Sequence, residues 1–578
     1  MVNKVHSCAL VALSLVLLSG AGCRFQSSDA QWDAAKSETT LAQHTEIFKQ
    51  RVEKVADGLY IAIGFGLANS ILIEGDDGVI IVDTMESMEA GEAVRAAFRK
   101  VTPKPVKAIV YTHNHADHIF GAEAFVDDSP PMVLAHATTE AYIDKIINIM
   151  RPIIFTRSMR QFGSLMPQDA VENCGIGPEL LVDRDTKPGL LRPTETFDGD
   201  RKRFVISGVE IELVFAPGET PDQIFVWLPK YKALLPGDNF YRSFPNLYAI
   251  RGTSYRDVMD WARSIDKMRT YEPELLLPSH TNVLRGKDQI ETALRNYRDA
   301  IQFVHDQTIR GINAGLTPDQ LVERVVLPPV LAADENLQEF YGTVEWSVRS
   351  IFTGYLGWFS GDAADLSPLT GKTRSQAFAK LAGGASELAE AARSALNEGD
   401  AAWAVELARE LSRLDGHEKE AADLLSKGFK ALAETSRSAN GRNYYLTQSM
   451  EWAGELEIGK QNVDAAPAQL IDSLPIEMFM SAMAVNLKPE YVSSVSKSMV
   501  VSFKDLNRSF LIELRHGLAD IREVKVFDTP LQIETTSSSW KHLLAGRTSL
   551  PELLVRGELS IAGDRIDVAA FLLHFEPT

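Results

Sequence analysis

The sequence predicts an α/β protein: two packed β-sheets with helices outside, followed by an all-α region and a small α+β domain. Between Val52 and Pro278, short apolar runs rich in β-branched residues alternate with helical segments. From Gly286 to about Leu456, apolar residues recur at helical spacing. After Asp464, apolar and polar residues alternate again, as in antiparallel strands. Strand pairs interrupted by helices indicate an αββα sandwich for the first part.

Length and charge set the number of domains and the class of ligand. A chain of 578 residues exceeds a single core, so several domains are expected. The formal net charge of −19 argues against nucleic acid as a partner. It leaves room for a small anionic substrate, because local cations decide the field inside a cleft. We expect a signal over 1–23, a tether over 24–50, the sandwich over 51–285, a helical domain over 286–456 and a C-terminal domain over 457–578.

The N-terminus predicts export. Lys4 gives a basic start, Cys8–Leu18 is a short apolar run, and small residues precede Cys23. This pattern is typical of a secretory signal and is too short to span a membrane in the mature protein. Cys23 resembles the acceptor cysteine of a bacterial lipoprotein, so we expect either a lipid-anchored or a free periplasmic protein. Only Cys174 remains after processing, which excludes a disulfide framework.

The expected strands of the sandwich are short apolar runs bounded by turn residues. Asp76-Asp77-Gly78 predicts a hairpin turn between the second and third of them, and Glu86–Lys100 predicts an amphipathic helix. The strands are expected at Leu59–Ile63, Ser70–Glu74, Val79–Asp83, Val106–Tyr111, Met132–Ala135, Val209–Ala216, Gln223–Leu228, Ala233–Leu235 and Leu275–Pro278.

The later regions are expected to have their own elements. Ala377–Leu396 and Ala401–Leu414 have the Ala, Glu and Leu content of helices. In the last domain, strands are expected at Met499–Phe503 and Phe510–His516, followed by a helix at Ser538–Leu544 and closing segments at Leu559–Ala562 and Val568–Phe575. Met478, Met480 and Met483 lie at helical spacing and are expected in a core rather than in a lipid slot.

A metal-binding motif follows the strand at Val106–Tyr111. His113, His115, Asp117 and His118 place four metal-binding side chains within six residues. Imidazole and carboxylate are usual zinc ligands, and a turn leaving a strand can aim all four at one point. Asp117 and His118 lie further along the turn than the first two histidines, a division typical of sites with two metals. The motif indicates a metal centre.

Three further ligand candidates each follow an apolar run. Glu219 lies in Pro-Gly-Glu-Thr, Asp238 in Pro-Gly-Asp and His280 in Pro-Ser-His. A rigid sheet would present such residues at a common edge. Taken singly, each is more often a solvated turn residue or a cap. Their order and context together make them candidates for a second set of ligands.

These motifs, in this order, resemble those of the metallo-β-lactamase-fold hydrolases, which carry a binuclear zinc centre at the edge of a β-sandwich. Many members have histidine where this chain has Glu219, and a glutamate there is a mark of the alkylsulfatases, which cleave long-chain alkyl sulfate esters. Three more segments resemble that branch, and the last domain resembles its sterol-carrier-type domain. The three segments are Asn246-Leu-Tyr-Ala-Ile-Arg251-Gly, Tyr355-Leu-Gly-Trp-Phe-Ser-Gly and Gly441-Arg-Asn-Tyr-Tyr-Leu-Thr.

The resemblance implies a set of site residues. One zinc would be held by His113, His115 and Glu219. The other would be held by Asp117, His118 and His280, with Asp238 bridging the two ions. A water shared by both ions would become a hydroxide at neutral pH. The expected catalytic set is Asp117, Asp238, Arg251, Asn246 and Tyr248, with Arg251 as the guanidinium fork for sulfate.

Two departures from the family concern Asp238 and the segment after it. The family usually has glutamate where this chain has Asp238. Its histidine-bearing stretch further on is here Tyr241-Arg-Ser-Phe-Pro-Asn246. Either Tyr241 or Arg242 takes over what those histidines do, or no residue does.

The leading functional expectation is a zinc-dependent hydrolase that cleaves alkyl sulfate esters to alcohol and sulfate. One alternative uses the same metals on another ester, such as a lactone, thioester or phosphoester. The other is a non-catalytic exported lipid-binding protein. The resemblance of the helical region implies a homodimer, in which Trp346, Trp358 and Phe359 would lie either in the helical core or at the dimer interface.

Overall fold

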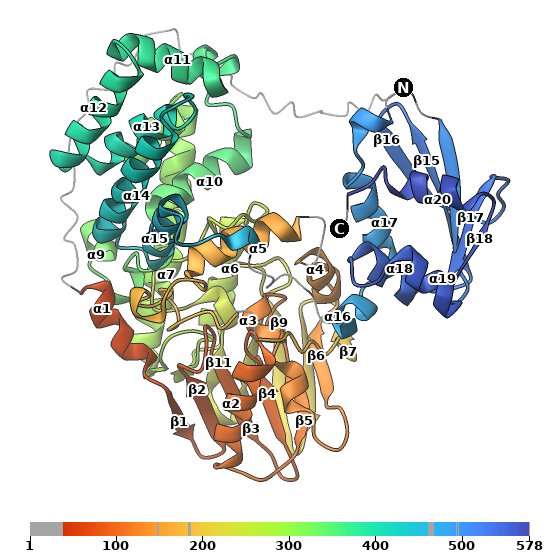
Figure 1. Ribbon diagram of the computed structural model, residues 1–578. Coiled ribbons are helices and arrows are strands. Elements are labelled where there is room, and N and C mark those ends of the chain that lie inside the picture. The colour runs from red at the N-terminus through yellow and green to blue at the C-terminus, as the bar shows by residue number, and fades with distance from the viewer. Residues whose placement is uncertain are drawn as a thin grey trace, which may run out of the picture. The chain divides into compact units, whose positions relative to one another are not determined.

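The computed structural model describes residues 39–146, 150–182, 186–460, 468–492, 494 and 496–576 (Figure 1). The predicted export signal, Cys23 and the first part of the predicted tether lie outside these residues. Among the helices of the described ranges, none combines the length and the apolar character that a membrane span requires.

The first sheet has seven strands whose spatial order follows the chain. Its first four strands are antiparallel, with the predicted hairpin turn at Asp76-Asp77-Gly78, and its last four are parallel. The strands are β1 (Arg51–Ala56), β2 (Leu59–Ile63), β3 (Ser70–Glu74), β4 (Val79–Val82), β5 (Val106–Val110), β6 (Met132–His136) and β7 (Glu195–Phe197).

The second sheet has six strands and packs face to face on the first. Ile61, Val82 and Val110 of the first sheet share one buried cluster with Ile211 and Val226 of the second, which confirms the predicted sandwich. Neighbours pair antiparallel except β11 and β12. The strands are β8 (Arg201–Ile206), β9 (Val209–Phe215), β10 (Ile224–Leu228), β11 (Ala233–Leu235), β12 (Leu275–Leu276) and β13 (Leu284–Arg285).

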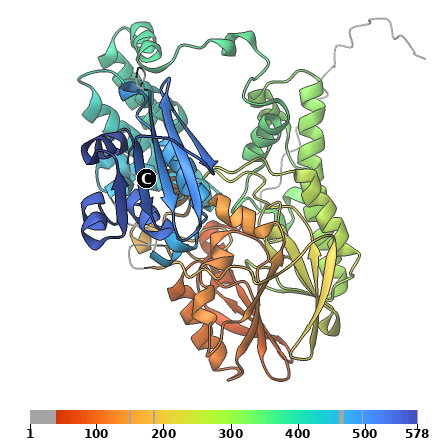
Figure 2. The same cartoon turned by 90° about the vertical axis from the view of Figure 1, so that its right-hand side faces the viewer.

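Helices cover the outer faces of both sheets. Helix α2 (Met88–Arg99) buries Val94 and Phe98 against the first sheet. It begins two residues later than predicted, because the Ser87 side chain accepts a hydrogen bond from the Ala90 N–H and caps the first turn. Helices α6 (Val258–Arg269) and α7 (Lys287–Asn313) cover the second sheet. Figure 2 shows α7, in light green, beside the yellow strands.

The helical region has two parts. Helices α7, α8 (Pro318–Arg324) and α10 (Val344–Leu356) share one buried cluster with the second sheet, so this core continues across the boundary expected at 286. Helices α11 to α14 form a separate cluster. The helix expected at Ala377–Leu396 is interrupted at Gly383-Gly384, where both glycines have positive φ, and this part of the prediction is wrong. The later helices are α11 (Gly371–Ala382), α12 (Ala385–Asn397), α13 (Ala401–Leu411), α14 (Glu418–Thr435) and α15 (Ala439–Ala453).

The C-terminal domain has a five-stranded sheet in the order β16-β15-β14-β17-β18. Met480 and Met483 lie in its buried core, as predicted, whereas Met478 is half-buried and outside that cluster. The strands β16 and β17 were not predicted; β16 has no fully buried residue and carries three charged side chains, so it lacks an apolar alternation. The elements are α17 (Ile476–Val485), β14 (Lys497–Phe503), β15 (Arg508–Arg515), β16 (Leu518–Val524), β17 (Leu531–Thr535), α18 (Ser537–Leu544), α19 (Leu550–Arg556), β18 (Leu559–Ala562) and α20 (Arg565–Leu572).

Part of the segment predicted as a tether is folded. Helix α1 (Leu41–His44) and a 3-10 turn at Thr45–Phe48 bury Leu41, His44 and Phe48. The His44 ring stacks on Phe340 with centroids 4.2 Å apart, and its Nε2 lies 2.9 Å from the Gly175 carbonyl oxygen. These contacts anchor the start of the described chain.

Candidate metal centre

The seven predicted ligands lie at loops that follow strands of the two sheets. The loop after β5 carries His113 and His115, and His115 is the N-cap residue of the short helix α3 (Ala116–Ile119), which carries Asp117 and His118. Three other loops supply the remaining ligands: Glu219 follows β9, Asp238 follows β11 and His280 follows β12.

The side chains of all seven converge. They form three overlapping groups, in each of which one ligand atom per residue lies within 4.8 Å of the others. Asp238 is central: its Oδ2 is 3.2 Å from His280 Nε2, and its Oδ1 is 3.4 Å from His118 Nε2. The groups are His113–His118–Asp238, Asp117–His118–His280 and His115–Glu219–Asp238.

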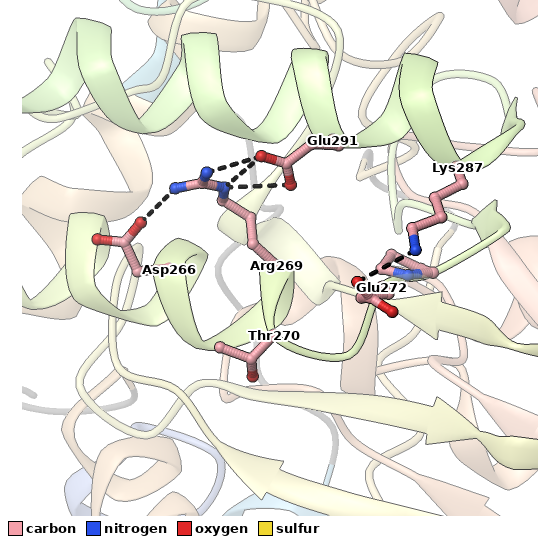
Figure 3. A pocket seen from close by; sticks show the side chains of 7 residues that line it. Asp266, Arg269, Thr270, Glu272, Lys287 and Glu291 are labelled. Carbon is pink, nitrogen blue, oxygen red and sulfur yellow. Dashed lines mark hydrogen bonds and ion pairs between the residues drawn. The ribbon is translucent and has the colours of Figure 1, made fainter.

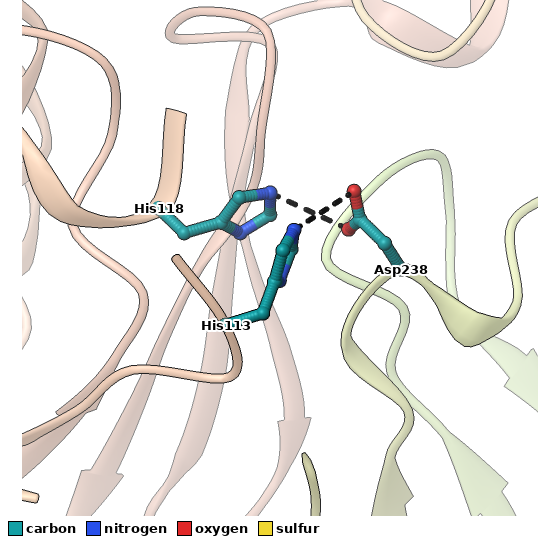
Figure 4. Close-up of side chains that lie close together, drawn as sticks. All are labelled: His113, His118 and Asp238. Atoms are coloured by element: carbon teal, nitrogen blue, oxygen red, sulfur yellow. Dashed lines mark ion pairs between the residues drawn. The ribbon is translucent and has the colours of Figure 1, made fainter. Parts of the chain in front are cut away.

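The buried ligand atoms fit a divalent cation. Within the described residues, His113 Nε2, His118 Nε2, Glu219 Oε2 and Asp238 Oδ1 are fully buried and form no hydrogen bond. Unpaired buried polar atoms are costly, so their convergence requires a partner. Figure 4 shows the side chains of His113 and His118 directed at the carboxylate of Asp238, which belongs to the opposite sheet. Imidazole nitrogens and carboxylate oxygens at such a point are the donor set of zinc-type sites.

Asp83, at the end of β4, orients the histidine loop. Its Oδ2 lies 2.9 Å from His118 Nδ1 and accepts hydrogen bonds from Thr112 Oγ1 at 2.9 Å and Ser279 Oγ at 2.7 Å. A carboxylate at Nδ1 fixes the tautomer of His118 and leaves Nε2 free for a metal. This role of Asp83 was not predicted, although Asp83 follows an apolar strand just as the three isolated ligands do.

Two further ligand histidines, His113 and His280, are held in the same way. His113 Nδ1 is 3.0 Å from Thr112 Oγ1, which itself donates to Asp83. His280 Nδ1 is 2.9 Å from the carbonyl oxygen of Leu67. In both rings Nδ1 has a partner, so Nε2 is the atom that faces the centre.

Glu219 is paired with a buried arginine that was not predicted. Arg256 donates from Nη1 to Glu219 Oε1 at 2.8 Å, and both side chains are almost wholly buried. Burial raises the pKa of Glu219 to about 7, and the Arg256 charge opposes this rise. Oε1 is thus engaged, whereas Oε2 remains free to bind a metal. Arg256 precedes α6 and has no sequence signal other than its closeness to Arg251.

Charges within the centre shift its pKa values in opposite directions. Although burial disfavours the charged form, neighbouring His280, His118 and His113 hold the pKa of Asp238 well below its usual value. Burial likewise opposes protonation of His118, but Asp238 and Asp117 raise its pKa well above the usual range. Asp238 is therefore ionised, and its charge favours a proton on His118, whose place a metal cation can take.

Two of the predicted substrate residues lie beside the ligands. Arg251 is half-buried, its Nη2 is 3.2 Å from His115 Nε2, and its backbone N–H donates to Gln161 Oε1 at 2.9 Å. Asn246 is buried with Oδ1 free of hydrogen bonds in the described chain, and its N–H donates to Tyr241 Oη at 2.7 Å. Tyr248 is half-buried in the same loop.

The segment that replaces the family's histidines divides into two roles. Arg242 donates from Nε to Asn336 Oδ1 at 2.9 Å and from Nη1 to Asn282 Oδ1 at 3.0 Å, so it is engaged elsewhere. Tyr241 is fully buried and packs edge-on against His280, with ring centroids 6.1 Å apart. Of the two candidates, Tyr241 is the one that lines the centre.

A surface hollow between α6 and α7 lies apart from these residues (Figure 3). Its charged side chains pair with one another: Arg269 with Glu291 and Asp266, and Lys287 with Glu272. These pairings leave little charge for a ligand, and the hollow contains none of the predicted site residues.

Family models match three consecutive parts of the chain. The metallo-beta-lactamase superfamily matches residues 63–280, alkyl sulfatase dimerisation matches 317–455 and alkyl sulfatase C-terminal matches 464–578. The order of these matches is the order of the three structural regions.

Individual relatives agree with the family models. A linear primary-alkylsulfatase of Pseudomonas sp. (strain ATCC 19151) is 35% identical over 522 residues, which cover 87% of this chain and 98% of that protein. An (R)-specific secondary-alkylsulfatase of Pseudomonas sp. is 27% identical over 88% of this chain and 78% of its own. The structure of a stereoselective inverting sec-alkylsulfatase from Pseudomonas sp. matches with a TM-score of 0.84 and 25% identity, covering 93% of this chain and 86% of that one. The chain therefore belongs to the alkylsulfatase family of the metallo-β-lactamase superfamily and is a sulfuric ester hydrolase with a metal-binding fold.

Proposed function

We propose that this enzyme hydrolyses alkyl sulfate esters to an alcohol and inorganic sulfate, with two zinc ions held by the seven converging side chains. The observation that carries the proposal is the group of buried ligand atoms without hydrogen bonds at one edge of the sandwich. His113, His115 and Glu219 would hold one ion. Asp117, His118 and His280 would hold the other.

Asp238 is the residue suited to bridge the two sets. Its Oδ2 is 3.6 Å from His113 Nε2, in the first set, and 3.2 Å from His280 Nε2, in the second. When bound, a pair of metal ions supplies Lewis acidity and lowers the pKa of a coordinated water. Asp238 and Asp117 would hold and orient the attacking water relative to the ester.

The half-buried Arg251 beside the centre suits an anionic ester. A sulfate monoester repels an anionic nucleophile, so bound substrate needs positive charge and directional donors around its oxygens. Arg251 lies against His115 and can present guanidinium donors there. The neighbouring Asn246 and Tyr248 would complete the binding loop. Tyr241 closes the wall next to His280 and excludes water from that side.

Sulfate release from purified protein tests this function. We expect dodecyl sulfate to be hydrolysed, with loss of activity after chelation and recovery after zinc is restored. A lactone, a thioester and a phosphodiester assayed in parallel separate the alternative esters; faster turnover of any of them would contradict the proposed substrate. Elemental analysis close to two zinc ions per chain supports the centre, whereas metal-free active protein would refute it.

We propose that the chain acts as a homodimer. A model of the alkyl sulfatase dimerisation region matches 317–455. Within it, residues 353–358 and 361–373 are exposed, including Trp358 at 73%, Leu366 at 58% and Leu369 at 56%. Exposed apolar side chains so close in sequence suit contact with a second copy. A Trp358→Ser, Leu366→Ser variant should sediment as a monomer; an unchanged dimer would exclude this segment as the interface.

We also propose export with lipidation at Cys23. The basic start, the short apolar run and the small residues before the cysteine support it. The intact mass of the mature protein from its host should show diacylation at an N-terminal Cys23. An unmodified N-terminus would indicate free periplasmic export.

A further inference from the structure

A buried carboxylate outside the ligand set lies close to the centre. Glu86 is only 1% exposed and occupies the loop between β4 and α2. Its Oε1 accepts hydrogen bonds from the N–H groups of Leu67, at 3.1 Å, and Leu181, at 2.8 Å. Burial raises its pKa to about 7, while these backbone donors oppose the rise. Carboxylates are seldom fully buried, so this one requires a reason.

The surroundings of Glu86 are shaped to hold it. A Cβ on Gly66 would lie 2.5 Å from Glu86 Oε1, so only a glycine there lets the carboxylate reach the Leu67 N–H. On the other side, a Cβ on Gly177 would lie 2.1 Å from the Leu67 carbonyl oxygen. Leu67 is therefore held on two sides: the Glu86 carboxylate packs against Gly66, and Gly177 packs against the Leu67 carbonyl.

Leu67 connects Glu86 to the metal centre. The N–H of Leu67 donates to Glu86, and the carbonyl of the same residue pairs with His280 Nδ1 at 2.9 Å. Partners at the second ring nitrogen fix the tautomer and orientation of a metal-binding histidine. A shift of Leu67 would therefore turn the His280 ring and move its Nε2 away from Asp238 and Asp117.

We infer that Glu86 is a positioning residue for the metal centre: its carboxylate fixes the Leu67 carbonyl that orients His280. The inference depends on the proposed function only in taking His280 as a ligand. Glu86 acts through the backbone and touches neither the substrate nor the ions. Its hydrogen-bond acceptor matters for this role, whereas its charge does not.

Zinc affinity of the full-length protein tests the inference. Metal-free protein is titrated with zinc against a chromophoric chelator, and thermal unfolding of each metal-free variant is recorded alongside. We expect Glu86→Ala to weaken the binding of one zinc ion roughly 10- to 100-fold. Glu86→Gln keeps the oxygen that accepts both N–H groups and should bind zinc within about threefold of the wild type, even if its unpaired amide lowers stability.

Two further variants separate positioning from loop stability. Glu89→Ala is the matched control, because Glu89 accepts from the Lys187 N–H in the same region but has no link to His280; it should leave zinc affinity unchanged. Gly66→Ala displaces the carboxylate without removing it and should reproduce the Glu86→Ala loss, which keeps the test decisive if Glu86→Ala does not fold.

The outcomes are distinct. Wild-type affinity in a folded Glu86→Ala or Gly66→Ala variant overturns the inference. Equal losses in Glu86→Gln and Glu86→Ala also overturn it, because charge rather than hydrogen bonding would then be responsible. A wild-type protein that binds no zinc refutes the proposed function, and this inference with it.

Discussion

The two sides of the metal centre are built differently. The loop after β5 and the short helix α3 that follows it supply His113, His115, Asp117 and His118 from one short stretch. The opposite side supplies Glu219, Asp238 and His280 from three separate loops of the second sheet. The first arrangement is determined by one turn of chain, whereas the second exists only once the strands of the second sheet are in register. The first side can be recognised locally, and the second depends on the whole sandwich.

The sides also differ in how their ligands are held. On the loop side, Asp83 and Thr112 hold two histidines by neutral or charge-assisted hydrogen bonds. On the other side, Glu219 is held by the full charge of Arg256. Asp83 joins the two sides, since it bonds both His118 and Ser279 next to His280. We therefore expect different effects from removing a ligand, a charge or a hydrogen bond: on sulfate release, on the free energy of unfolding and on zinc affinity, respectively.

The largest effect is expected from removing a ligand on the loop side. His118→Ala removes a side chain common to two of the three ligand groups. Sulfate release should fall on the order of a thousandfold or more, beyond the 10- to 100-fold typical of changes to outer residues. Folding should persist, because Asp83 retains Thr112 and Ser279 as partners. Circular dichroism and sulfate assay check both points, and retained turnover would count against the ligand assignment.

Removing the cation on the opposite side should mainly affect stability. Arg256→Met leaves Glu219 buried and unpaired, which costs about 3–5 kcal/mol in the free energy of unfolding. Denaturant unfolding of the metal-free protein measures this loss. Adding Glu219→Gln should recover much of it, because no buried charge then remains. Additive losses in the double variant would show that the two groups do not interact.

Weakening the link between the sides should give a smaller effect. Asp83→Asn puts an amide in place of the carboxylate that bonds to His118 Nδ1. The tautomer of the ring is then no longer fixed. Zinc affinity should fall roughly 10- to 100-fold. Ser279→Ala removes only one of the three side-chain hydrogen bonds to Asp83 Oδ2. It should weaken zinc binding less, by about 1 kcal/mol of binding free energy. If the serine variant lost more affinity than the aspartate variant, Asp83 would not be the link.

A buried histidine away from the centre gives the smallest effect. Burial lowers the pKa of His44 to about 4, and the Gly175 carbonyl only partly opposes this. Between that value and the unfolded value of 6.5, the unfolded chain binds more protons, so stability falls as the pH falls. From about pH 7 to about pH 5.5 the loss should be about 1 kcal/mol.

The His44 effect needs a variant that does not titrate. His44→Phe keeps an aromatic ring against Phe340. Its free energy of unfolding should lack the change of about 1 kcal/mol that His44 contributes between the two pH values. Unfolding free energies measured at both pH values check this. Identical slopes in the two proteins would exclude His44 as the source.

The sequence predicted elements with regular apolar patterns and missed those defined by pairing. β2, β3 and β11 have the predicted bounds. β1 and β8 were not predicted. β8, Arg201–Ile206, is charged and mostly exposed, and it pairs only with β9. Gly383 and Gly384 divide a run whose composition is otherwise helical.

The same distinction applies to the site. The histidine loop is visible from spacing alone. The other three ligands required their order along the chain and the family resemblance to distinguish them from ordinary turn residues. Asp83, Arg256 and Glu86 were not predicted, since single acidic or basic residues acquire a role only from the partners that the fold brings to them.

Anomalous diffraction at the zinc absorption edge, from crystals of the purified full-length protein, would show directly whether the seven side chains hold two zinc ions. We expect two peaks, one among His113, His115 and Glu219 and one among Asp117, His118 and His280, with Asp238 contacting both. A single peak, or peaks away from these side chains, would contradict this expectation.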